Sequence, residues 1–340
     1  MRDQPRQPPA RVPHEPLVVT VADPQLVEGV GELPEGVRLR LWDLASPLAL
    51  PDEVAVVVPP YFVGGRLELL GDLANLRLVQ TLTAGYDDVL SSLPDGVALA
   101  NAVGVHDAST SELAIGLAIA ALRGFPAFVR AQDQGQWRWE QLRSLADRRV
   151  LVVGYGGVGR AVARRALAFE TTVTAVASRA RPTGEDRVVV HGVDELPALL
   201  PHHDVVIVTV PLTDATRGLV DAVFLAAMPD GALLVNVARG PVVVTAALMA
   251  ELATGRLLAA LDVTDPEPLP PDHELWHLPG VLISPHVGGS TSAMLPRALD
   301  LLREQLRRVW TGEPLRGIVV PTAWSEPAKS EPAGSLLAGS

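Results

Sequence analysis

The glycine turn Gly154-Tyr155-Gly156-Gly157-Val158-Gly159 decides the fold of the larger part of this chain. It directly follows the apolar run 149–153 and directly precedes Arg160-Ala161-Val162-Ala163, a pattern typical of a strand, a tight turn and a helix. The first glycine permits the turn, the second lets a pyrophosphate approach the backbone, and the third lets the helix pack closely on the sheet. The helix would present free amide hydrogens to the phosphates. The sequence therefore predicts a strand–turn–helix unit that binds a dinucleotide.

Short apolar runs alternate with helical patterns along the chain. Beyond the turn, strands are predicted at 172–177, 187–190, 204–210, 232–237, 258–263 and 281–284, and helices at 158–169 and 244–254. Before the turn, strands are predicted at 17–21, 37–42, 54–58, 78–83 and 97–100, with a helix at 67–76. Strands this short, rich in valine and leucine and separated by helices, are typical of parallel sheets covered on both faces. The fold class is therefore α/β, with two doubly wound parallel sheets.

The length of 340 residues predicts two domains. A helix at 109–123 begins the domain that carries the glycine turn, and a final helix at 292–310 returns the chain to the first sheet. We therefore expect a Rossmann dinucleotide-binding domain over 103–289. It would be inserted in a flavodoxin-like substrate domain made of 17–102 plus 290–321.

Composition narrows the classes of function. Apolar residues make up 48% and charged residues 20% of the chain, so each domain can bury a full core. The net charge of −11 argues against a nucleic-acid partner, which normally needs a basic face. The chain contains no cysteine, which excludes a disulfide framework, a thiolate nucleophile and a cysteine-bound metal.

The two ends of the chain are predicted to be disordered. The lead 1–16 is rich in proline, arginine and glutamine, and the tail 322–340 is rich in proline, serine, alanine and glycine. The lead has no apolar core of a secretory signal. Apolar stretches elsewhere are broken by charges, glycine or proline well before a membrane-spanning length. We therefore expect a cytoplasmic protein without a membrane partner.

One short segment matches a metal motif. His273-Glu274-Leu275-Trp276-His277 has the HExxH spacing of zinc proteases, which requires both histidines on one helical face and a third ligand elsewhere. Here Pro270-Pro271 precedes the segment and Leu278-Pro279-Gly280 closes it, leaving barely one helical turn. We therefore expect no metal site.

The end of the second strand of the dinucleotide domain bears on the cofactor. NAD-selective sites place an acid about 20 residues beyond the glycine turn, where it binds the ribose hydroxyls. Here the strand at 172–177 runs into Ser178-Arg179-Ala180-Arg181, which contains no acid. The Ser178 hydroxyl and one or two guanidinium groups could bind a 2′-phosphate, which favours NADP over NAD. Alternatively, Arg179 and Arg181 are merely solvated loop residues.

Three later residues suit the reduction of a 2-oxo acid, namely Arg239, Glu267 and His286. The planar guanidinium of Arg239 matches a substrate carboxylate, and its charge can polarise the ketone. The imidazole of His286 titrates near neutrality and can donate the proton. Glu267, bonded to the far ring nitrogen, would favour the imidazolium and fix the tautomer. Glu267 is also one of several acids in a proline-rich loop. Among these acids, Asp265 is the main alternative to Glu267 as the partner of His286.

Several segments together resemble the D-isomer-specific 2-hydroxyacid dehydrogenase family, which includes glyoxylate/hydroxypyruvate reductases, phosphoglycerate dehydrogenases and formate dehydrogenases. The resemblance extends over nearly everything from about residue 50 to 315. It rests on the glycine turn and on five further segments: Val210-Pro211-Leu212-Thr213-Asp214-Ala215-Thr216-Arg217-Gly218, Met228-Pro229-Asp230-Gly231, Asn236-Val237-Ala238-Arg239-Gly240, Ala260-Leu261-Asp262-Val263 with Glu267-Pro268-Leu269 after it, and Ser284-Pro285-His286-Val287-Gly288-Gly289-Ser290-Thr291.

The resemblance implies Arg239 as the substrate anchor, His286 as the acid/base and Glu267 as its partner. One loop of the first domain also resembles the family, namely Thr83-Ala84-Gly85-Tyr86-Asp87. In the family the backbone amides of this loop hold the substrate carboxylate, which implies this role for the amides of Ala84 and Gly85. By the same match, Asp262 would lie near the nicotinamide, and Val210, Pro211 and Thr216 near the adenosine half of the cofactor. The remaining implied cofactor contacts are Gly154, Gly156, Gly157, Val158, Gly159, Val237, Ala238 and Gly288.

The function implied is D-specific hydride transfer between NAD(P)H and a small 2-oxo or 2-hydroxy acid of the glyoxylate or hydroxypyruvate type, in a cleft between the domains. A homodimer through 109–143, a segment that contains Trp137 and Trp139, is also implied. The carboxylate at Glu267 argues against formate, for which the family carries glutamine. Tyr86 stands where smaller residues are common, so the pocket size stays open. A nucleotide-sensing binding protein of the corepressor type and a phosphite dehydrogenase are the alternative functions.

Overall fold

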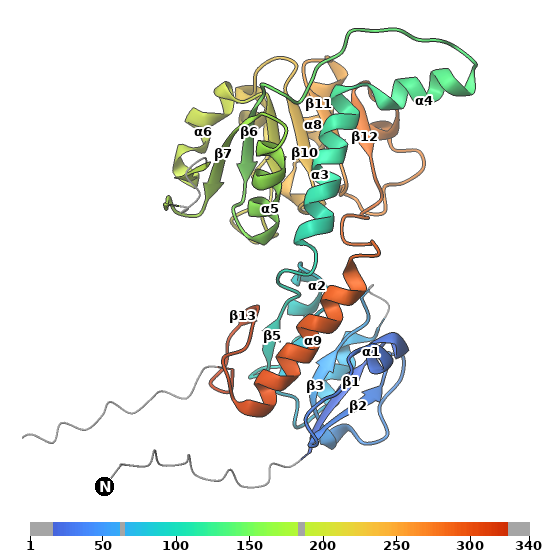
Figure 1. Cartoon of the computed structure of the whole chain (residues 1–340), viewed down its shortest axis with the longest axis vertical. Helices are drawn as coiled ribbons and strands as arrows, with labels where there is room; N and C mark the ends of the chain where they lie inside the picture. Colours follow the sequence, from blue (N-terminus) through green and yellow to red (C-terminus); the bar gives the residue numbers. More distant parts are fainter. Residues whose placement is uncertain (1–15, 62–64, 183–187, 326–340) are drawn as a thin grey trace, which may run out of the picture. The chain divides into compact units, whose positions relative to one another are not determined.

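The computed structural model describes residues 16–61, 65–182 and 188–325. The chain divides into two compact units, one made of residues up to Ala102 together with those from Ala298 onward, the other Val103–Arg297 (Figure 1). The second boundary is predicted at 290 from the sequence. It lies instead inside the last long helix, because Ala298 is the first residue of that helix to be buried. Apart from Pro16, the predicted disordered lead lies outside the described residues.

The prediction that disorder begins at 322 is wrong for four residues. Residues 323–325 form a turn, whereas 326–340 lie outside the described residues. The Thr322 amide donates to Oγ of Ser325 at 2.8 Å, and the Ser325 amide donates to the Thr322 carbonyl at 3.0 Å. Hydroxyl-to-backbone bonds of this kind stabilise a turn that composition alone marks as disordered.

The first unit contains a six-stranded sheet of order β13-β5-β4-β3-β1-β2. Its strands are β1 (Leu17–Val21), β2 (Val37–Leu41), β3 (Val54–Val58), β4 (Leu78–Gln80), β5 (Ala98–Ala100) and β13 (Ile318–Val320). The strands β2-β1-β3-β4-β5 are parallel, in the flavodoxin-like order, so the predicted fold of this unit is confirmed. The edge strand β13 is antiparallel to β5. The sequence analysis does not predict β13, because three residues are too few to show a period.

Helices fill the connections of the first unit and cover its sheet. They are α1 (Pro24–Gly29), η1 (Pro51–Glu53), η2 (Leu67–Asp72), α2 (Asp87–Leu90) and α9 (Met294–Thr311). The α-helix predicted at 67–76 is instead the shorter 3-10 helix η2. Gly71 is a poor α-helix former, and the tight turn brings Leu69, Leu70 and Leu73 into one core.

The second unit contains a seven-stranded parallel sheet of order β12-β11-β10-β9-β6-β7-β8. Its strands are β6 (Arg149–Val153), β7 (Thr172–Ala177), β8 (Val188–Gly192), β9 (Val205–Val208), β10 (Leu233–Asn236), β11 (Leu258–Leu261) and β12 (Val281–Ile283). Each predicted strand of this sheet is present. The order is that of a Rossmann sheet. From β6 the chain adds β7 and β8 on one side and then β9 to β12 on the other, so the switch point lies between β6 and β9. This confirms the predicted fold class.

Alternate residues of the central strands enter two separate cores. Val150 and Val152 of β6 pack with α3 (Asp107–Leu122) and α5 (Gly157–Leu167), which lie together in front of the sheet in Figure 1. Leu151 and Val153 pack on the other face, with α7 (Ala222–Ala227) and α8 (Thr245–Ala253). Burial on both faces explains why β6 reads as a continuous apolar run. The other helices of this unit are α4 (Phe125–Asp133), η3 (Val193–Glu195), α6 (Leu196–Leu199), η4 (Leu200–His202), η5 (Gly240–Val242) and η6 (Glu274–His277).

Within the described ranges, no single helix is long and apolar enough to span a membrane. The pair α3 and α4 passes the same test of length and composition together, but the two helices are bent by 66°.

Candidate active site

The glycine turn joins β6 to α5 and fits the phosphates of a dinucleotide. Gly154 has a φ of +104°, and a Cβ on Gly159 would lie 1.9 Å from the Gly154 carbonyl oxygen, so both positions require glycine. A Cβ on Gly156 would meet nothing within 4 Å, so this position faces open space. Gly156 is the N-cap of α5 and offers no side chain to the amides of the first turn, which leaves those of 157–159 for an anion. A Cβ on Gly157 would instead meet the Asp107 carboxylate.

The segment 178–181, which is predicted to select the cofactor, follows β7 at the same edge of the sheet. Ser178 and Arg179 are exposed there. The Arg181 Nη2 donates to the Tyr155 carbonyl at 2.8 Å, so this guanidinium is held against the glycine turn. The structure therefore places one of the two candidate arginines beside the predicted phosphate site.

The expected adenosine and nicotinamide contacts lie beyond β9 and β10, the next strands along the sheet. Thr216 closes the turn after β9, since its hydroxyl donates to the Pro211 carbonyl at 2.6 Å. Val210 precedes this turn. Beyond β10, Val237 and Ala238 are buried, and the Ala238 amide donates to Oδ1 of Asn236 at 3.0 Å. All these residues share the carboxyl edge of the sheet with the glycine turn, where open α/β sheets bind ligands.

Arg239, Glu267 and His286 lie at this edge, beyond the neighbouring strands β10, β11 and β12. Oε1 of Glu267 and Nδ1 of His286 are 2.5 Å apart. Arg239 is close enough for its charge to act on both groups, and its Nη1 donates to the Ala238 carbonyl at 2.9 Å. The structure therefore brings together the three residues that the sequence analysis selected.

The pair of Glu267 and His286 alters the acidity of both groups. The hydrogen bond to Glu267 raises the pKa of His286 above its ordinary value, against burial, and the Glu267 charge adds to the rise while Arg239 opposes it. Burial raises the pKa of Glu267, but the hydrogen bond and charge of His286 outweigh it and lower that pKa overall. The pair therefore favours the charged form of His286 more than a free imidazole would.

Asp262 organises the loop that carries His286. Its carboxylate accepts hydrogen bonds from the Ser284 hydroxyl at 2.6 Å and from the amides of Val287 and Gly288, both at 2.9 Å. Its carbonyl accepts from the His286 amide at 2.7 Å. His286 has a φ of +53°, a conformation that a histidine adopts only where its surroundings hold it. Asp262, expected beside the nicotinamide, thus also fixes the backbone of His286, and the Gly288 amide is bound within the protein.

In the first unit, the loop after β4 presents a nest of backbone amides. The carbonyls of 83–85 accept hydrogen bonds from the Ala102 amide (2.9 Å), the Asn101 side chain (2.8 Å) and the Thr83 hydroxyl (2.6 Å), respectively. Among the described residues, no acceptor is found for the amides of 84–86. Adjacent amides with no internal acceptor are suited to a carboxylate.

Asn101 is a candidate site residue that the sequence analysis missed. Its side chain bonds to the Ala84 carbonyl, inside the loop expected to hold the substrate. The signal that could have found it is its position directly after β5, because a polar residue at the carboxyl end of a parallel strand is well placed for a site.

Comparisons with known proteins identify the family of the chain. Residues 115–288 match the family model of the D-isomer specific 2-hydroxyacid dehydrogenase NAD-binding domain. The chain is 30% identical over 292 residues to glyoxylate/hydroxypyruvate reductase A of Arabidopsis thaliana, covering 83% of this chain and 92% of that one. It is 33% identical over 257 residues to a D-3-phosphoglycerate dehydrogenase of Archaeoglobus fulgidus, covering 74% of this chain but only 49% of that relative. The chain therefore spans about half the length of the second relative.

A solved structure is also similar. A D-isomer specific 2-hydroxyacid dehydrogenase from Xanthobacter autotrophicus Py2, in complex with NADPH and MES, is 31% identical with a TM-score of 0.77. The similarity covers 90% of this chain and 98% of that chain.

A histidine whose pKa is raised by a carboxylate partner, beside an arginine at the edge of a dinucleotide-binding sheet, suits the reduction of a carbonyl group. The class of protein that this fold and site define is the NAD(P)-dependent oxidoreductase. Within that class, the matches to sequence and structure agree on one family. The chain belongs to the D-isomer-specific 2-hydroxyacid dehydrogenase family, which confirms the resemblance seen in the sequence.

Proposed function

We propose that the protein reduces a small 2-oxo acid to the D-2-hydroxy acid, with NADPH as the preferred cofactor. The observation that carries this proposal is the 2.5 Å contact of Glu267 and His286 beside Arg239, at the carboxyl edge of the sheet that carries the glycine turn. Ketone reduction needs a cation for the carboxylate and a protonated group for the carbonyl oxygen, and these residues supply both.

Each residue has a defined part in this proposal. The Arg239 guanidinium binds the substrate carboxylate and its charge polarises the ketone. His286 donates its Nε2 proton to the ketone oxygen, which becomes the hydroxyl, and Glu267 holds the ring in place before and after the transfer. In the first unit, the amides of Ala84 and Gly85 are suited to bind a carboxylate. When bound, the reduced nicotinamide supplies the hydride.

The preference for NADPH rests on the segment after β7. The stretch 178–181 offers a hydroxyl and two guanidinium groups and no carboxylate. A 2′-phosphate is a strong partner for such a group, whereas the ribose hydroxyls of NAD lack the acid that usually binds them. The complex of the Xanthobacter autotrophicus relative with NADPH supports the same choice.

The substrate class follows from a pocket that the amide nest borders in the first unit. Tyr61, Tyr86 and Asp88 lie among its lining residues, and of the described residues that line it Asp88 is the only carboxylate and none is basic. A second negative charge on the substrate would therefore face an acid with no counterion. This pocket favours an uncharged, short substituent, as in glyoxylate and hydroxypyruvate, over a phosphorylated or dicarboxylic 2-oxo acid.

We also propose a homodimer that uses 109–143. Within this segment, Trp137 is 96% exposed and Trp139 is 80% exposed, and Phe125 and Val129 of α4 are exposed as well. Large apolar side chains gathered on one short segment mark an interaction surface, and tryptophan is enriched at interfaces.

Initial rates with a panel of short 2-oxo acids test the proposed function. We expect glyoxylate and hydroxypyruvate to be reduced with a higher kcat/KM for NADPH than for NADH, and phosphohydroxypyruvate and oxaloacetate to be poor substrates. Chiral analysis of the glycerate formed from hydroxypyruvate should give the D isomer. Tight NADPH binding without turnover of any 2-oxo acid would contradict the proposal and indicate a nucleotide-sensing protein.

Replacing Arg179 by alanine should weaken NADPH binding by about tenfold and leave NADH binding almost unchanged, because only NADPH carries the 2′-phosphate. Fluorescence titration with each reduced cofactor measures the two dissociation constants. Arg38→Ala, which removes an exposed arginine of β2 in the first unit, is the matched control for a general loss of charge. Equal effects of Arg179→Ala on both cofactors would favour the solvated-loop interpretation.

A further inference from the structure

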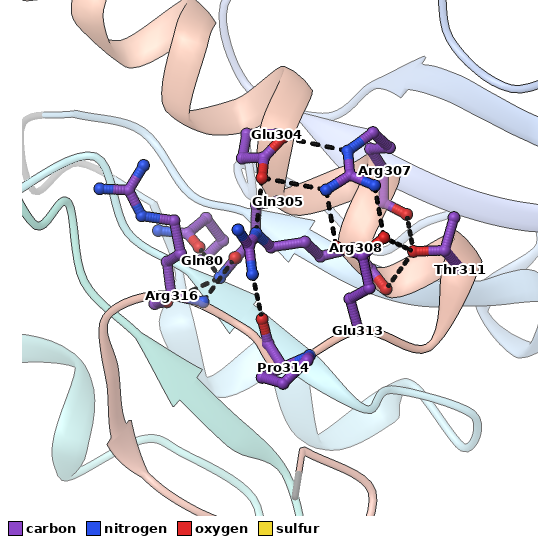
Figure 2. Close-up of polar contacts among 9 residues, drawn as sticks. All are labelled: Gln80, Glu304, Gln305, Arg307, Arg308, Thr311, Glu313, Pro314 and Arg316. Carbon is purple, nitrogen blue, oxygen red and sulfur yellow. Dashed lines mark hydrogen bonds and ion pairs between the residues drawn. The ribbon is translucent and has the colours of Figure 1, made fainter. Parts of the chain in front are cut away.

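A buried pair of glutamines lies beneath the amide nest of the first unit. Gln80 ends β4, four residues before Ala84 of the nest, and Gln305 lies within α9; both are 0% exposed. Figure 2 shows the two carboxamides facing one another, with Nε2 of Gln305 donating to Oε1 of Gln80 at 2.8 Å. A buried carboxamide costs free energy unless its polar groups are bonded, so the contacts of this pair have to be complete.

The surroundings allow only one orientation of each carboxamide. Nε2 of Gln80 faces carbonyl oxygens alone, those of Thr81 at 2.9 Å, Asn101 at 3.2 Å and a third residue at 3.4 Å. Its Oε1 must therefore point to Gln305. Gln305 in turn accepts from the Arg316 amide and donates to the Arg316 carbonyl, both at 2.9 Å. A flipped amide at either position would oppose oxygen to oxygen.

These bonds continue through Asn101 to the nest. The carbonyl of Asn101 is bound by Gln80, and its backbone amide donates to the Gly317 carbonyl at 2.9 Å. Asn101 is thus held both by the glutamine pair and by the segment that leads into β13. Its side-chain amide donates to the Ala84 carbonyl at 2.8 Å.

The contact with the Ala84 carbonyl determines where the next amide points. In a planar trans peptide, the carbonyl oxygen and the following N–H lie on opposite sides of the bond. Because Asn101 binds the Ala84 carbonyl, the Gly85 amide is directed to the side of the peptide that faces away from the Asn101 side chain. No acceptor for that amide is found among the described residues.

We propose that Asn101, Gln80 and Gln305 are positioning residues that aim the Gly85 amide at the substrate carboxylate. The inference rests on the proposed function, because it takes the amide nest to be a carboxylate site. Asn101 acts directly on the peptide between Ala84 and Gly85, and the glutamine pair holds Asn101. The segment 305–317 thereby contributes to substrate affinity without touching the substrate.

The ion pairs at the end of α9 have a separate role. Arg307 bonds to Glu304 and Glu313, and Arg308 bonds to Glu304 and to the Pro314 carbonyl (Figure 2). They hold the turn that leads to β13, and their exposure makes each pair a weak contributor to stability. Hydrogen bonds from Arg307 lower the pKa of both glutamates to about 2. These pairs therefore stay ionised at any pH used to assay the enzyme.

Asn101→Ala tests the inference most directly. It should raise the KM for glyoxylate and the Kd for oxamate, a carboxylate that is not reduced, by about three- to tenfold. The kcat should change less than about twofold, and the Kd for NADPH should not change. Asn75→Ala is the matched control, because the Asn75 side chain also donates to a backbone carbonyl of this unit, that of Asp52 at 2.7 Å, away from the nest.

Gln305→Glu tests the action of the glutamine pair at a distance. A carboxylate would set an oxygen against the oxygens of Gln80 and Arg316, and burial would raise its pKa, so protonation restores one donor at lower pH. The Kd for oxamate, divided by that of the wild type at the same pH, should therefore rise between about pH 6 and pH 9. A purely structural role would lower the melting temperature without this pH dependence.

An oxamate Kd of Asn101→Ala within twofold of the wild type overturns the inference. Equal losses in Asn101→Ala and Asn75→Ala, or a parallel loss of NADPH affinity, overturn it as well. If the wild type reduces no 2-oxo acid, the proposed function fails. If the wild type reduces glyoxylate normally and Asn101→Ala does so with the same KM, only this inference fails.

Discussion

Arg239→Ala should lower kcat/KM for glyoxylate by about a thousandfold, while the Kd for NADPH changes by less than about threefold. Of Arg239, Glu267 and His286, only Arg239 carries a planar guanidinium that matches a carboxylate. It lies beside the Glu267–His286 pair and not at the glycine turn. Its removal leaves the substrate carboxylate without its charged partner and the ketone less polarised. Steady-state kinetics and fluorescence titration with NADPH measure the two effects separately.

Arg239→Lys is the informative companion variant. Lysine keeps the positive charge but loses the planar fork, so its kcat/KM should fall between those of the wild type and Arg239→Ala. The anchoring role is refuted if Arg239→Ala weakens NADPH and glyoxylate to the same extent. That result would place Arg239 in the general architecture of the cofactor site.

Glu267→Gln should move the alkaline limit of the reduction to lower pH by about one unit. Reduction needs the protonated ring of His286, so activity is lost as the pH rises through its pKa. The hydrogen bond to Glu267 is the main cause that raises this pKa, and its charge adds to the rise. With glutamine in its place, burial and the Arg239 charge lower the pKa of His286 against less opposition. The pH profile of kcat/KM for glyoxylate measures the shift.

Asp265→Asn is the matched control for this experiment. Asp265 is exposed in the same proline-rich loop, so it shares the composition of the site without the contact to His286. Its replacement should leave the alkaline limit where it is. An unchanged profile in Glu267→Gln, or an equal shift in Asp265→Asn, would count against the proposed pair.

The strands of the second sheet and the proximity of Arg239, Glu267 and His286 could be predicted from the sequence for the same physical reason. Burial on both faces makes each central strand a continuous apolar run, and the end of such a run marks the edge where ligands bind. Arg239 and His286 each follow such a run, so the sequence alone marks both as candidates. The choice of Glu267 over Asp265 needed the family resemblance, since two acids in one loop have no period that separates them.

What could not be predicted depends on contacts between residues far apart in sequence. Asn101 bonds to Gly317, and Gln80 bonds to Gln305, each through a single hydrogen bond. Such bonds have no counterpart in the local pattern of apolar and polar residues. The hydrogen bonds from the loop amides of Val287 and Gly288 to the Asp262 carboxylate also join residues far apart in sequence. Short elements such as β13 and η2 escape detection because they are shorter than the windows in which periodicity is measured.

The first unit consists of two segments that lie far apart in the sequence, and this has a consequence for its biosynthesis. Its sheet and its covering helix draw on residues up to Ala102 and again from Ala298 onward. A ribosome that adds about 5–20 residues per second needs roughly ten to forty seconds to bridge that gap. During this interval Val103–Arg297 emerges whole and can fold, whereas the N-terminal strands wait, with an apolar sheet face still uncovered, for α9 and β13. The strands up to Ala102 are therefore made well before α9 and β13, which complete the same unit.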